Sequence, residues 1–302
     1  MGLYQNARPR IQGPGTLAFG PPNQIGKTPQ NPPIRRQLTA MKSKVILTTY
    51  GNAVALWHAE KVGRHLLSKT QKCLLWTMPL VTAADRMEHW RVEEGGLFGK
   101  ELEEALLSER ADIAIHFAEN IPLVLPDGLD IAGYLPRGDA REVLVKNVYV
   151  TRVERIGVNS PRRRAQIQAM FPEAEYVAPR GTLAARLQAV CDGFCDVMIT
   201  EAWALEALST RDFPSLTFEF MGPHTLVPSA GQGAIAVECR TRDVDFFRPL
   251  LDATTFARVT QERNWLAKQD LADPNSAGIH VDEHGRQFTF LPKRPPVAIR
   301  QS

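Results

Sequence analysis

Two stretches, ELEEALLSERADIAIHF (Glu101–Phe117) and LAARLQAVCDGFCDVMIT (Leu183–Thr200), follow the same plan and decide the fold class. Each reads as a helix, a turn and a nearly all-apolar strand that is entered through an aspartate, Asp112 in the first stretch and Asp196 in the second. Continuous apolar strands that alternate with helices indicate a sheet covered on both faces. Helix–turn–strand units occur in all α/β proteins, which is the alternative explanation of the pair. We interpret the repetition as two similar βαβ lobes.

The surrounding sequence supplies elements of the same kind. We expect strands at Val45–Thr49, Cys73–Val81 and Ala111–Phe117, helices at Val54–Leu67 and Leu97–Leu107, and a mobile polar loop at Thr82–Glu94. The fold class that follows is α/β, with two lobes of the periplasmic-binding-protein type (type II) joined by a hinge. Ligands of such folds bind at the carboxyl ends of the strands, between the lobes.

The domain boundaries follow from these elements. We expect a disordered tail at 1–41, a first lobe at 42–138 with 229–242, a second lobe at 143–226, and a truncated small α+β C-terminal domain at 243–302. In the last of these, an amphipathic helical stretch (Val244–Gln269) precedes a hairpin formed by Ile279–Val281 and Gln287–Leu291. One helix and one hairpin make a thin domain.

Composition excludes several classes of protein. The first forty residues are rich in Pro, Gly, Gln and Asn, and the first acidic residue is Glu60, so this segment cannot offset its ordering entropy by apolar burial. The lack of acids is typical of an organellar transit peptide, but the prolines and glycines disfavour an amphipathic helix, and Met41 resembles a natural start. No apolar run approaches the roughly 18 residues of a membrane helix, and no secretory signal is recognisable, so we expect a cytoplasmic protein.

The four cysteines, Cys73, Cys191, Cys195 and Cys239, form no CxxC pair, and no histidine cluster completes a zinc site. Cys191 and Cys195 would share one face of a helix if the helix extends that far, which leaves a metal or redox role open. Two small buried residues are the simpler interpretation. We therefore expect no metal.

The sharpest local signal is IGVNSPRRRAQ, Ile156–Gln166. Ser160 followed by Pro161 is typical of a helix N-cap and first helical position. The arginines Arg162–Arg164 then fill the first turn, where cations oppose the helix dipole and reduce helix stability. Backbone N–H groups together with guanidinium groups suit a carboxylate or a phosphate. A solvated basic patch is the alternative interpretation.

Arg180 and Arg186 continue this basic surface at the start of the next helix. Seven arginines and three glutamates lie between Arg152 and Arg186, a balance that suits a ligand with several carboxylates. Nucleic acid is not expected as a partner, because the net charge is only +3 and no aromatic residues are interleaved with the basic ones. The Gly-rich segment Ser229–Arg240 lacks the spacing of a Rossmann or P-loop fingerprint. His116 follows the apolar run Ala111–Ile115, where the cleft is expected. We interpret it as a hydrogen-bonded structural residue.

Taken together, these segments resemble the hydroxymethylbilane synthase (porphobilinogen deaminase) family from about Lys44 to Arg263. The segments that carry the resemblance are VALWHAE (54–60), PLVTAAD (79–85), GGLFGKELEEALLSERADIAIH (95–116), LPDGLDIAGYLPRGDAREVLV (125–145), IGVNSPRRRAQ (156–166), Arg180–Arg186 and PSAGQGAIAVECR (228–240). Members of this family join four porphobilinogen units into a linear tetrapyrrole, with release of ammonia, on a dipyrromethane primer held by a cysteine. The resemblance therefore implies a place in tetrapyrrole biosynthesis.

The resemblance also implies roles for particular residues. In that family an aspartate stabilises the cationic intermediate, and basic residues hold the acetate and propionate groups. The cleft positions of the family are matched here by Ser160, Arg162, Arg163, Arg180, Arg186 and Gln232, with Asp85 at a loop aspartate and Arg91 near a loop lysine.

The chemical residues of the family are replaced. Its HSMKDVP motif reads HFAENIP here (His116–Pro122), which puts Asn120 at the catalytic aspartate position and Glu119 at the neighbouring lysine. Asparagine can hydrogen-bond a pyrrole N–H, but it supplies neither a proton nor a countercharge. None of the four cysteines matches the primer thiol, and Asp273 lies near its expected position. We therefore expect no covalently attached dipyrromethane cofactor.

Three functions are compatible with this pattern. The chain could bind porphobilinogen, a linear pyrrole or another polycarboxylate without making tetrapyrrole. It could also be an active synthase with altered primer handling, or a non-catalytic partner of a genuine synthase, monomeric by itself. A free-standing periplasmic solute binder is disfavoured, because no signal peptide is recognisable.

Overall fold

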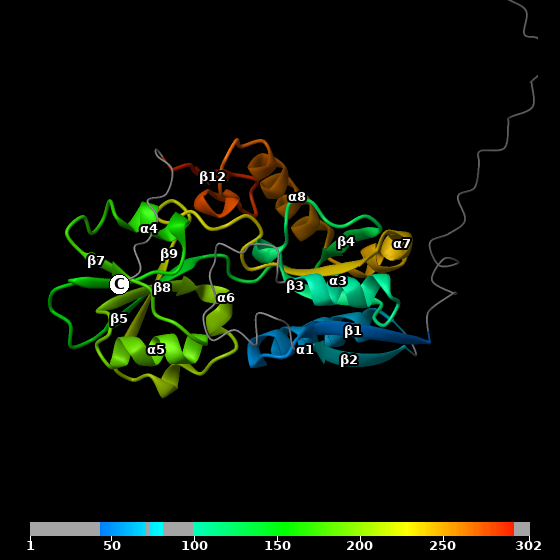
Figure 1. Ribbon diagram of the computed structural model, residues 1–302, viewed down its shortest axis with the longest axis horizontal. Coiled ribbons are helices and arrows are strands. Elements are labelled where there is room, and N and C mark those ends of the chain that lie inside the picture. Colours follow the sequence, from blue (N-terminus) through cyan, green and yellow to red (C-terminus); the bar gives the residue numbers. More distant parts are fainter. Residues whose placement is uncertain (1–42, 71–72, 81–98, 293–302) are drawn as a thin grey trace, which may run out of the picture. The chain divides into compact units, whose positions relative to one another are not determined.

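The computed structural model describes residues 43–70, 73–80 and 99–292 (Figure 1). The predicted tail at 1–41 and the predicted loop Thr82–Glu94, with Asp85 and Arg91, lie outside the described residues. The strands are β1 (Lys44–Tyr50), β2 (Leu74–Leu80), β3 (Ile113–Phe117), β4 (Leu129–Tyr134), β5 (Glu142–Asn147), β6 (Arg155–Gly157), β7 (Glu175–Val177), β8 (Val197–Glu201), β9 (Leu216–Met221), β10 (Ile235–Arg240), β11 (Gly278–Val281) and β12 (Gln287–Phe290). The helices are α1 (Ala53–Lys69), α3 (Lys100–Leu107), α4 (Pro161–Ile167), α5 (Leu183–Cys191), α6 (Ala202–Leu205), α7 (Val244–Phe247) and α8 (Ala253–Ala267).

Ten of the strands form two five-stranded sheets with the same topology. The first has the order β2-β1-β3-β10-β4 and the second the order β7-β6-β8-β5-β9. In each sheet three parallel strands are followed by one antiparallel strand, β10 or β5, which then pairs antiparallel with the last strand. Because β10 returns to the first sheet after the second is complete, the two halves are exchanged as in type II periplasmic-binding-protein folds. We call the first sheet with α1, α3 and α7 lobe 1, and the second with α4, α5 and α6 lobe 2.

The two predicted aspartates perform the same task in the two lobes. Asp112 Oδ2 accepts a hydrogen bond from the N–H of Ile46 at 2.9 Å, and its own N–H donates to the carbonyl of Ile46 at 2.8 Å. Asp196 repeats this on Arg155, with N–H distances of 2.8 Å to the carboxylate and 2.9 Å to the carbonyl. Each aspartate thus connects its strand to the adjacent parallel one, which confirms the repeat.

Both predicted helix–turn–strand units are present. Helix α5, however, is too short to carry Cys191 and Cys195 on one face. It ends at Cys191, and Gly193 follows with a φ of +75°, a backbone conformation that glycine adopts without strain. Cys195 therefore lies beyond the turn and is buried in the core of lobe 2. The condition for one helical face carrying both thiols is not met.

The amphipathic stretch Val244–Gln269 is divided into two helices, contrary to the single helix expected there. Pro249 lies in a short 3-10 turn between α7 and α8, and Asp252 caps α8 through the N–H of Thr255. Val244 and Phe247 of α7 belong to the core of lobe 1. The first part of the predicted C-terminal domain is therefore packed onto lobe 1.

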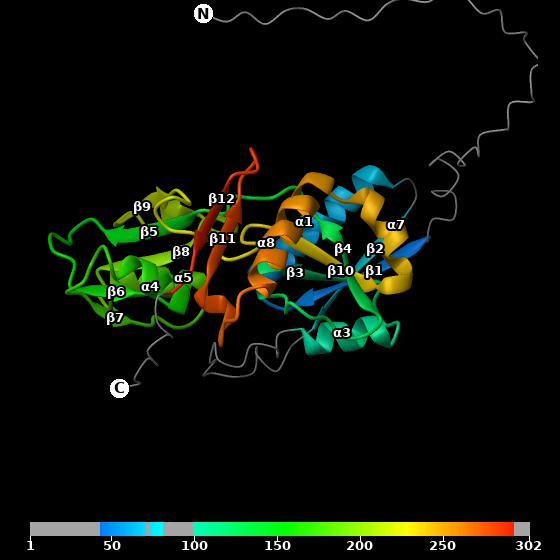
Figure 2. The same ribbon diagram turned by 90° about the horizontal axis from the view of Figure 1, so that it is seen from above.

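The C-terminal hairpin β11–β12 lies along α8 (Figure 2). Its central group is Glu262 of α8, whose side chain is fully buried. Glu262 accepts hydrogen bonds from the N–H groups of Gly231 and Val281, both at 2.7 Å, and forms an ion pair with Arg137 at 2.6 Å. One carboxylate thus joins the hairpin to both segments that connect the lobes. Across the described ranges, no helix combines the length and apolarity needed to cross a membrane.

Candidate functional site

The carboxyl ends of β3 and β8 are equivalent positions in the two lobes, and they carry different side chains. After β3 comes a 3-10 turn, Ala118–Asn120, which contains Glu119. Strand β8 ends in Glu201, and α6 begins at the next residue. Ligands of doubly wound sheets bind at such strand ends, so these two ends define the candidate site.

The predicted basic helix start is present, but its arginines are not a solvated patch. Ser160 is the N-cap of α4, its Oγ accepts from the N–H of Arg163, and Pro161 is the first helical residue. Arg162 is 1% exposed and Arg163 is 4% exposed. Arg164, which follows them, is half-buried against the ring of Tyr176. The two buried guanidinium groups need partners inside the protein.

Glu142, the first residue of β5, is the partner that both buried arginines share. Its side chain is fully buried, and its two oxygens accept from Arg162 at 2.6 Å and from Arg163 at 2.9 Å. Burial lowers the pKa of Arg162, whereas Glu142 and Glu201 raise the pKa of Arg163 against the effect of burial. In the sequence, the only signal for Glu142 is that a charged residue begins an apolar strand. We did not predict it as a site residue.

Glu201 forms the second ion pair of the site. Its Oε1 lies 2.6 Å from Arg163 Nη2, and its Oε2 accepts from the hydroxyl of Thr200 at 3.0 Å. Burial alone would raise the pKa of Glu201, but Arg163 and Arg186 bring it down to about 2. The carboxylate is therefore charged at neutral pH. Arg186 itself is half-buried, and its Nε has no hydrogen-bond partner.

Gln232 lies in the Gly-rich turn between the lobes and is 1% exposed. Its amide donates to the carbonyl of Ala140 at 2.8 Å, and its Oε1 accepts from Arg162 at 3.3 Å. Gly231 has a φ of +79°, and a Cβ there would lie 2.8 Å from the Cβ of Ala118. Glycine is therefore required by both conformation and space. The turn holds Arg162 of lobe 2 close to the turn that follows β3 of lobe 1.

Glu119 and Asn120 occupy that turn after β3. Asn120 is exposed to solvent. Glu119 has its Oε2 buried without a hydrogen-bond partner, and burial raises its pKa to about 8, with Glu201 acting in the same direction. A carboxyl group with that pKa is mostly protonated at neutral pH. The lobe 1 side of the site therefore carries little negative charge.

His116 is a structural residue, in keeping with its interpretation from sequence. It is 6% exposed, its Nε2 lies 2.7 Å from a carboxylate oxygen of Glu238, and its ring meets that of Tyr50 edge-on. Its neighbour Phe117 points elsewhere and stacks on Trp203 of α6 at 4.3 Å between ring centroids.

A cavity of about 310 Å³ adjoins this aromatic contact between the lobes. His58 of α1 lies against it, 3% exposed, with both ring nitrogens unpartnered. Burial lowers the pKa of this histidine to about 4, so the ring is neutral at physiological pH. Lys61 and Glu206 close one side of the cavity with an ion pair of 2.7 Å.

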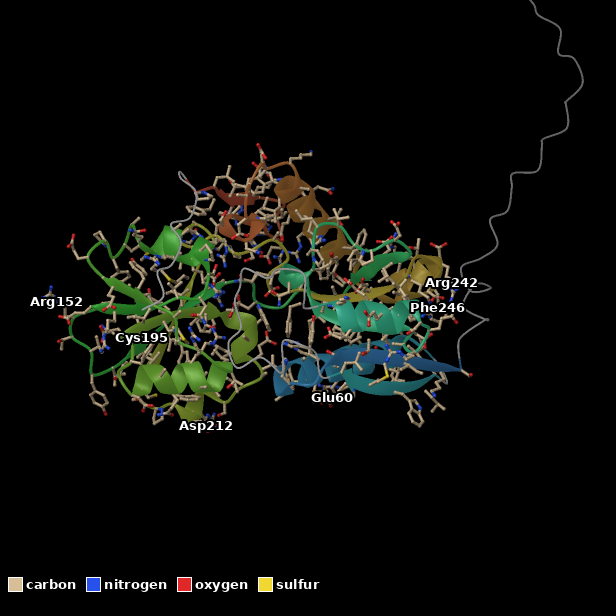
Figure 3. All side chains as sticks on the ribbon, viewed as in Figure 1. Glu60, Arg152, Cys195, Asp212, Arg242 and Phe246 are labelled. Atoms are coloured by element: carbon tan, nitrogen blue, oxygen red, sulfur yellow. The ribbon has the colours of Figure 1, made fainter. Side chains whose placement is uncertain are left out.

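The other predicted residues lie at the periphery or outside the description. Arg180 is exposed in the segment before α5. Asp273 is half-buried and caps a 3-10 turn by accepting from the N–H of Asn275 at 2.8 Å. Arg152 belongs to the same arginine-rich stretch, but it projects from the outer end of lobe 2 (Figure 3), before β6, and is 83% exposed. It serves as a natural control for the inner arginines.

All four cysteines are free, and they lie at the opposite ends of the sheets from Glu119 and Glu201. Cys73 precedes β2, Cys195 precedes β8 (Figure 3), Cys239 pairs with the first residue of β3, and Cys191 ends α5. Burial raises the pKa of Cys195 to about 11 and that of Cys239 to about 12. No thiolate is available at the strand ends. Among the described residues, no cluster of three or more His, Cys, Asp or Glu side chains could hold a metal.

Comparison with known proteins shows the family to which the chain belongs. Residues 45–248 match the family model described as "Porphobilinogen deaminase, dipyromethane cofactor binding domain". The porphobilinogen deaminase of Chromobacterium violaceum is 32% identical over 237 residues, which is 75% of each chain. That of Albidiferax ferrireducens is 33% identical over 232 residues, 73% of this chain and 72% of the relative. The chain belongs to the porphobilinogen deaminase family.

Among solved structures, the periplasmic VFT2 domain of BvgS from Bordetella pertussis is 15% identical, covers 76% of this chain and 96% of its own, and gives a TM-score of 0.46. The fold is established by the two sheet orders of the chain itself.

Membership of the porphobilinogen deaminase family places the candidate site in tetrapyrrole biosynthesis. Of the cleft residues expected from the family, the structure brings Ser160, Arg162, Arg163, Arg186 and Gln232 together around the strand ends. It adds two acids that we did not predict as site residues, Glu142 and Glu201. Glu119, which the resemblance puts next to the catalytic position of the family, lies within electrostatic reach of Glu201.

Proposed function

We propose that this porphobilinogen deaminase homologue binds a porphobilinogen-type pyrrole or another small polycarboxylate between its lobes and does not polymerise it. The observation that carries the proposal is the state of the turn after β3. Its exposed side chain is the amide of Asn120, and its acid, Glu119, has a pKa raised to about 8. A reaction that builds positive charge on a pyrrole methylene needs a fixed negative charge beside it, worth several kcal/mol of barrier.

The charged acid at the end of β8, Glu201, does not replace the missing one. Glu201 is committed to Arg163 at 2.6 Å and to Thr200 at 3.0 Å. When a carboxylate is paired with a guanidinium group, the positive charge largely cancels its electrostatic potential, so it stabilises a developing cation only weakly. The site therefore supports anion binding better than cation stabilisation.

The positions of the thiols support the same proposal. A covalent primer needs a reactive thiolate, and reactive cysteines have lowered pKa values in accessible electropositive surroundings. Here burial raises the pKa of Cys195 and of Cys239, and both residues are at the wrong ends of their sheets. Free thiols throughout the chain also suit the cytoplasm, where we place the protein.

The test starts with the full-length chain as expressed. Intact mass spectrometry should give the mass of the polypeptide alone, and incubation with porphobilinogen should give no uroporphyrin absorbance after oxidation. An added dipyrromethane mass, or a rising absorbance, would instead establish the alternative, an active synthase with altered primer handling.

Binding is measured separately by calorimetric titration with porphobilinogen. Arg186→Gln should weaken binding about tenfold or more, because it removes a charge-assisted contact. The matched control is Arg152→Gln, which removes the same charge from the outer end of lobe 2 and should leave the affinity unchanged. No heat with the wild-type chain would remove the proposed ligand class.

A second role, as a non-catalytic partner of a genuine synthase, is favoured by the edge of lobe 1. Strand β2 is an edge strand of its sheet, and Leu74 and Trp76 on it are 64% and 60% exposed. Exposed apolar side chains on a sheet edge are typical of an interaction surface. Co-purification with a cysteine-bearing paralogue tests this role, and Trp76→Lys should weaken the complex. Absence of a complex at micromolar concentration would exclude it.

A further inference from the structure

Two buried polar atoms near the Arg163–Glu201 ion pair have no hydrogen-bond partner among the residues that the structure describes. They are Nε of Arg186, which comes from α5 in lobe 2, and Oε2 of Glu119, which comes from the turn after β3 in lobe 1. Each is within electrostatic reach of both members of the ion pair. Buried polar groups in native proteins are nearly always satisfied. An unpartnered donor and an unpartnered carboxyl oxygen beside the same ion pair mark a polar subsite.

Among the described residues, the charges around this subsite nearly cancel. Three guanidinium groups, those of Arg162, Arg163 and Arg186, face two carboxylates held in ion pairs, those of Glu142 and Glu201, while Glu119 is mostly protonated at neutral pH. Within this part of the chain, one positive charge is left over. A site that binds a chain of acidic pyrroles would need many more unpaired cations, because each ionised group taken out of water needs its own partner.

Glu201 is the reason that the net positive charge of the subsite is so small. Its carboxylate lies 2.6 Å from a guanidinium nitrogen of Arg163, at the strand end where a ligand of this fold would bind. Glu142 differs from it, because its side chain is completely buried and bonds to both Arg162 and Arg163. Glu142 is part of the framework, whereas Glu201, 21% exposed, faces the site.

We propose that Glu201 takes the place of one ligand carboxylate, so that the remaining subsite between Arg186 and Glu119 accepts one carboxylate next to an uncharged hydrogen-bonding group. This inference rests on the proposed function and narrows it. The ligand class is a single acidic pyrrole or a similarly small acid, not a linear chain of such units. Arg186 binds the carboxylate, and the protonated Glu119 bonds to the uncharged group.

The decisive variant is Glu201→Gln, which keeps the shape of the side chain and removes its charge. Three probes are titrated into the full chain: porphobilinogen, uroporphyrin as a stable carrier of the carboxylates of four pyrrole units, and sulfate. Removing the charge should tighten uroporphyrin binding about tenfold or more, and porphobilinogen binding less, because a multiply charged ligand gains most from an unpaired guanidinium. Sulfate should raise the Tm of the variant more than that of the wild type.

The matched control is Glu219→Gln, which makes the same change of charge at an exposed position on β9. It should leave all three probes unchanged. If Glu201→Gln does not fold, Glu201→Asp keeps the charge but withdraws it from Arg163, and it should give a smaller gain in the same direction.

The outcomes separate this inference from the proposed function. If the wild type binds porphobilinogen but the Glu201 variant gains nothing for uroporphyrin or sulfate, the inference is overturned and the function stands. If no form binds a pyrrole but sulfate stabilises the Glu201 variant selectively, Glu201 does fill an anion site and the proposed ligand class is wrong. If neither pyrroles nor sulfate distinguish the variant, both are overturned.

Discussion

Lobe 1 and lobe 2 start their central strands in the same way and finish them differently. The strand entered through Asp112 ends in Phe117 and a turn with the amide of Asn120, whereas the strand entered through Asp196 ends in the charged Glu201. At the beginning of each strand, an aspartate binds the backbone of the neighbouring parallel strand. At the end, the side chains of Glu119 and Glu201 do not connect neighbouring strands of the sheet in this way; Glu201 instead forms an ion pair with Arg163.

The difference teaches where sequence is constrained by the fold and where by the ligand. Both lobes carry an aspartate at the strand start because the sheet needs it, since an unsatisfied backbone N–H costs about as much as a lost hydrogen bond. The strand ends carry different side chains, and the two sheets nevertheless share one topology. The charge at the strand ends can therefore differ between the lobes without a change in the fold.

The largest effect is expected from Glu142→Ala, which breaks the charged framework of lobe 2. It leaves the guanidinium groups of Arg162 and Arg163 buried with fewer partners, and the loss in free energy of unfolding should be about 3–5 kcal/mol. Urea unfolding followed by circular dichroism measures it. The exposed Glu60→Ala on α1 is the control and should stay within about 0.5 kcal/mol. A loss below about 1 kcal/mol for Glu142→Ala would contradict the framework role.

Next in size are Asp112→Ala and Asp196→Ala, which remove the same device from each lobe. Each leaves at least one backbone N–H of a central sheet without its acceptor, and each should cost about 1–3 kcal/mol. Hydrogen exchange on β1 and on β6 should increase only in the lobe that carries the substitution. The equivalence of the lobes fails if one substitution is tolerated freely and the other is not.

Glu119 and Glu201 should give stability opposite dependences on pH. The folded-state pKa of Glu119 is raised to about 8, so its contribution is full below its unfolded value near 4.5 and is lost as the pH rises to about 8. Glu201, with a pKa near 2, contributes above pH 4.5 and loses that contribution as the pH falls to about 2. Unfolding curves of Glu119→Gln and wild type should therefore converge at low pH and separate in favour of the variant at pH 9. Parallel curves would exclude a raised pKa.

The smallest effect is expected from Asn120→Asp, which restores an acid to the exposed turn of lobe 1. Stability should change by less than about 0.5 kcal/mol, because the side chain is in solvent. Under the proposed function, porphobilinogen turnover should be absent in this variant as well, since the cysteines are at the far ends of the sheets. Turnover in this single variant would show that the missing acid alone had silenced the site.

Most of the fold could be predicted because its signals are local. Local signals of a few neighbouring residues each are the continuous apolar strands, the two aspartates that precede them, the Ser160–Pro161 helix start and the two strands of the C-terminal hairpin. The break between α7 and α8 was not predicted, although Pro249 is a helix-breaking residue at that point. The apolar residues on both sides of it have the spacing of one continuous helix. Periodicity showed the helical face but not the interruption.

The site was harder to predict because its charges pair over long distances in sequence. Arg162 is recognisable as basic, but its burial depends on Glu142, twenty positions earlier, and on Gln232, seventy positions later. Glu201 looks like an ordinary residue at the end of a strand until Arg163 is placed beside it. A single sequence shows which residues can carry charge and not which charges cancel.

The buried carboxylate of Glu262 has a consequence for how the chain assembles. Its partners lie 125, 31 and 19 positions away along the sequence, in Arg137, Gly231 and Val281. None of these contacts can stabilise a partly folded chain until the intervening residues have been closed into loops, which costs conformational entropy. During synthesis, the contacts of Glu262 with Arg137 and Gly231 can therefore form only after α8 has been made, and its contact with Val281 only after β11 has followed. The two connections between the lobes are thus joined to each other late, by a helix that lies after both of them in the chain.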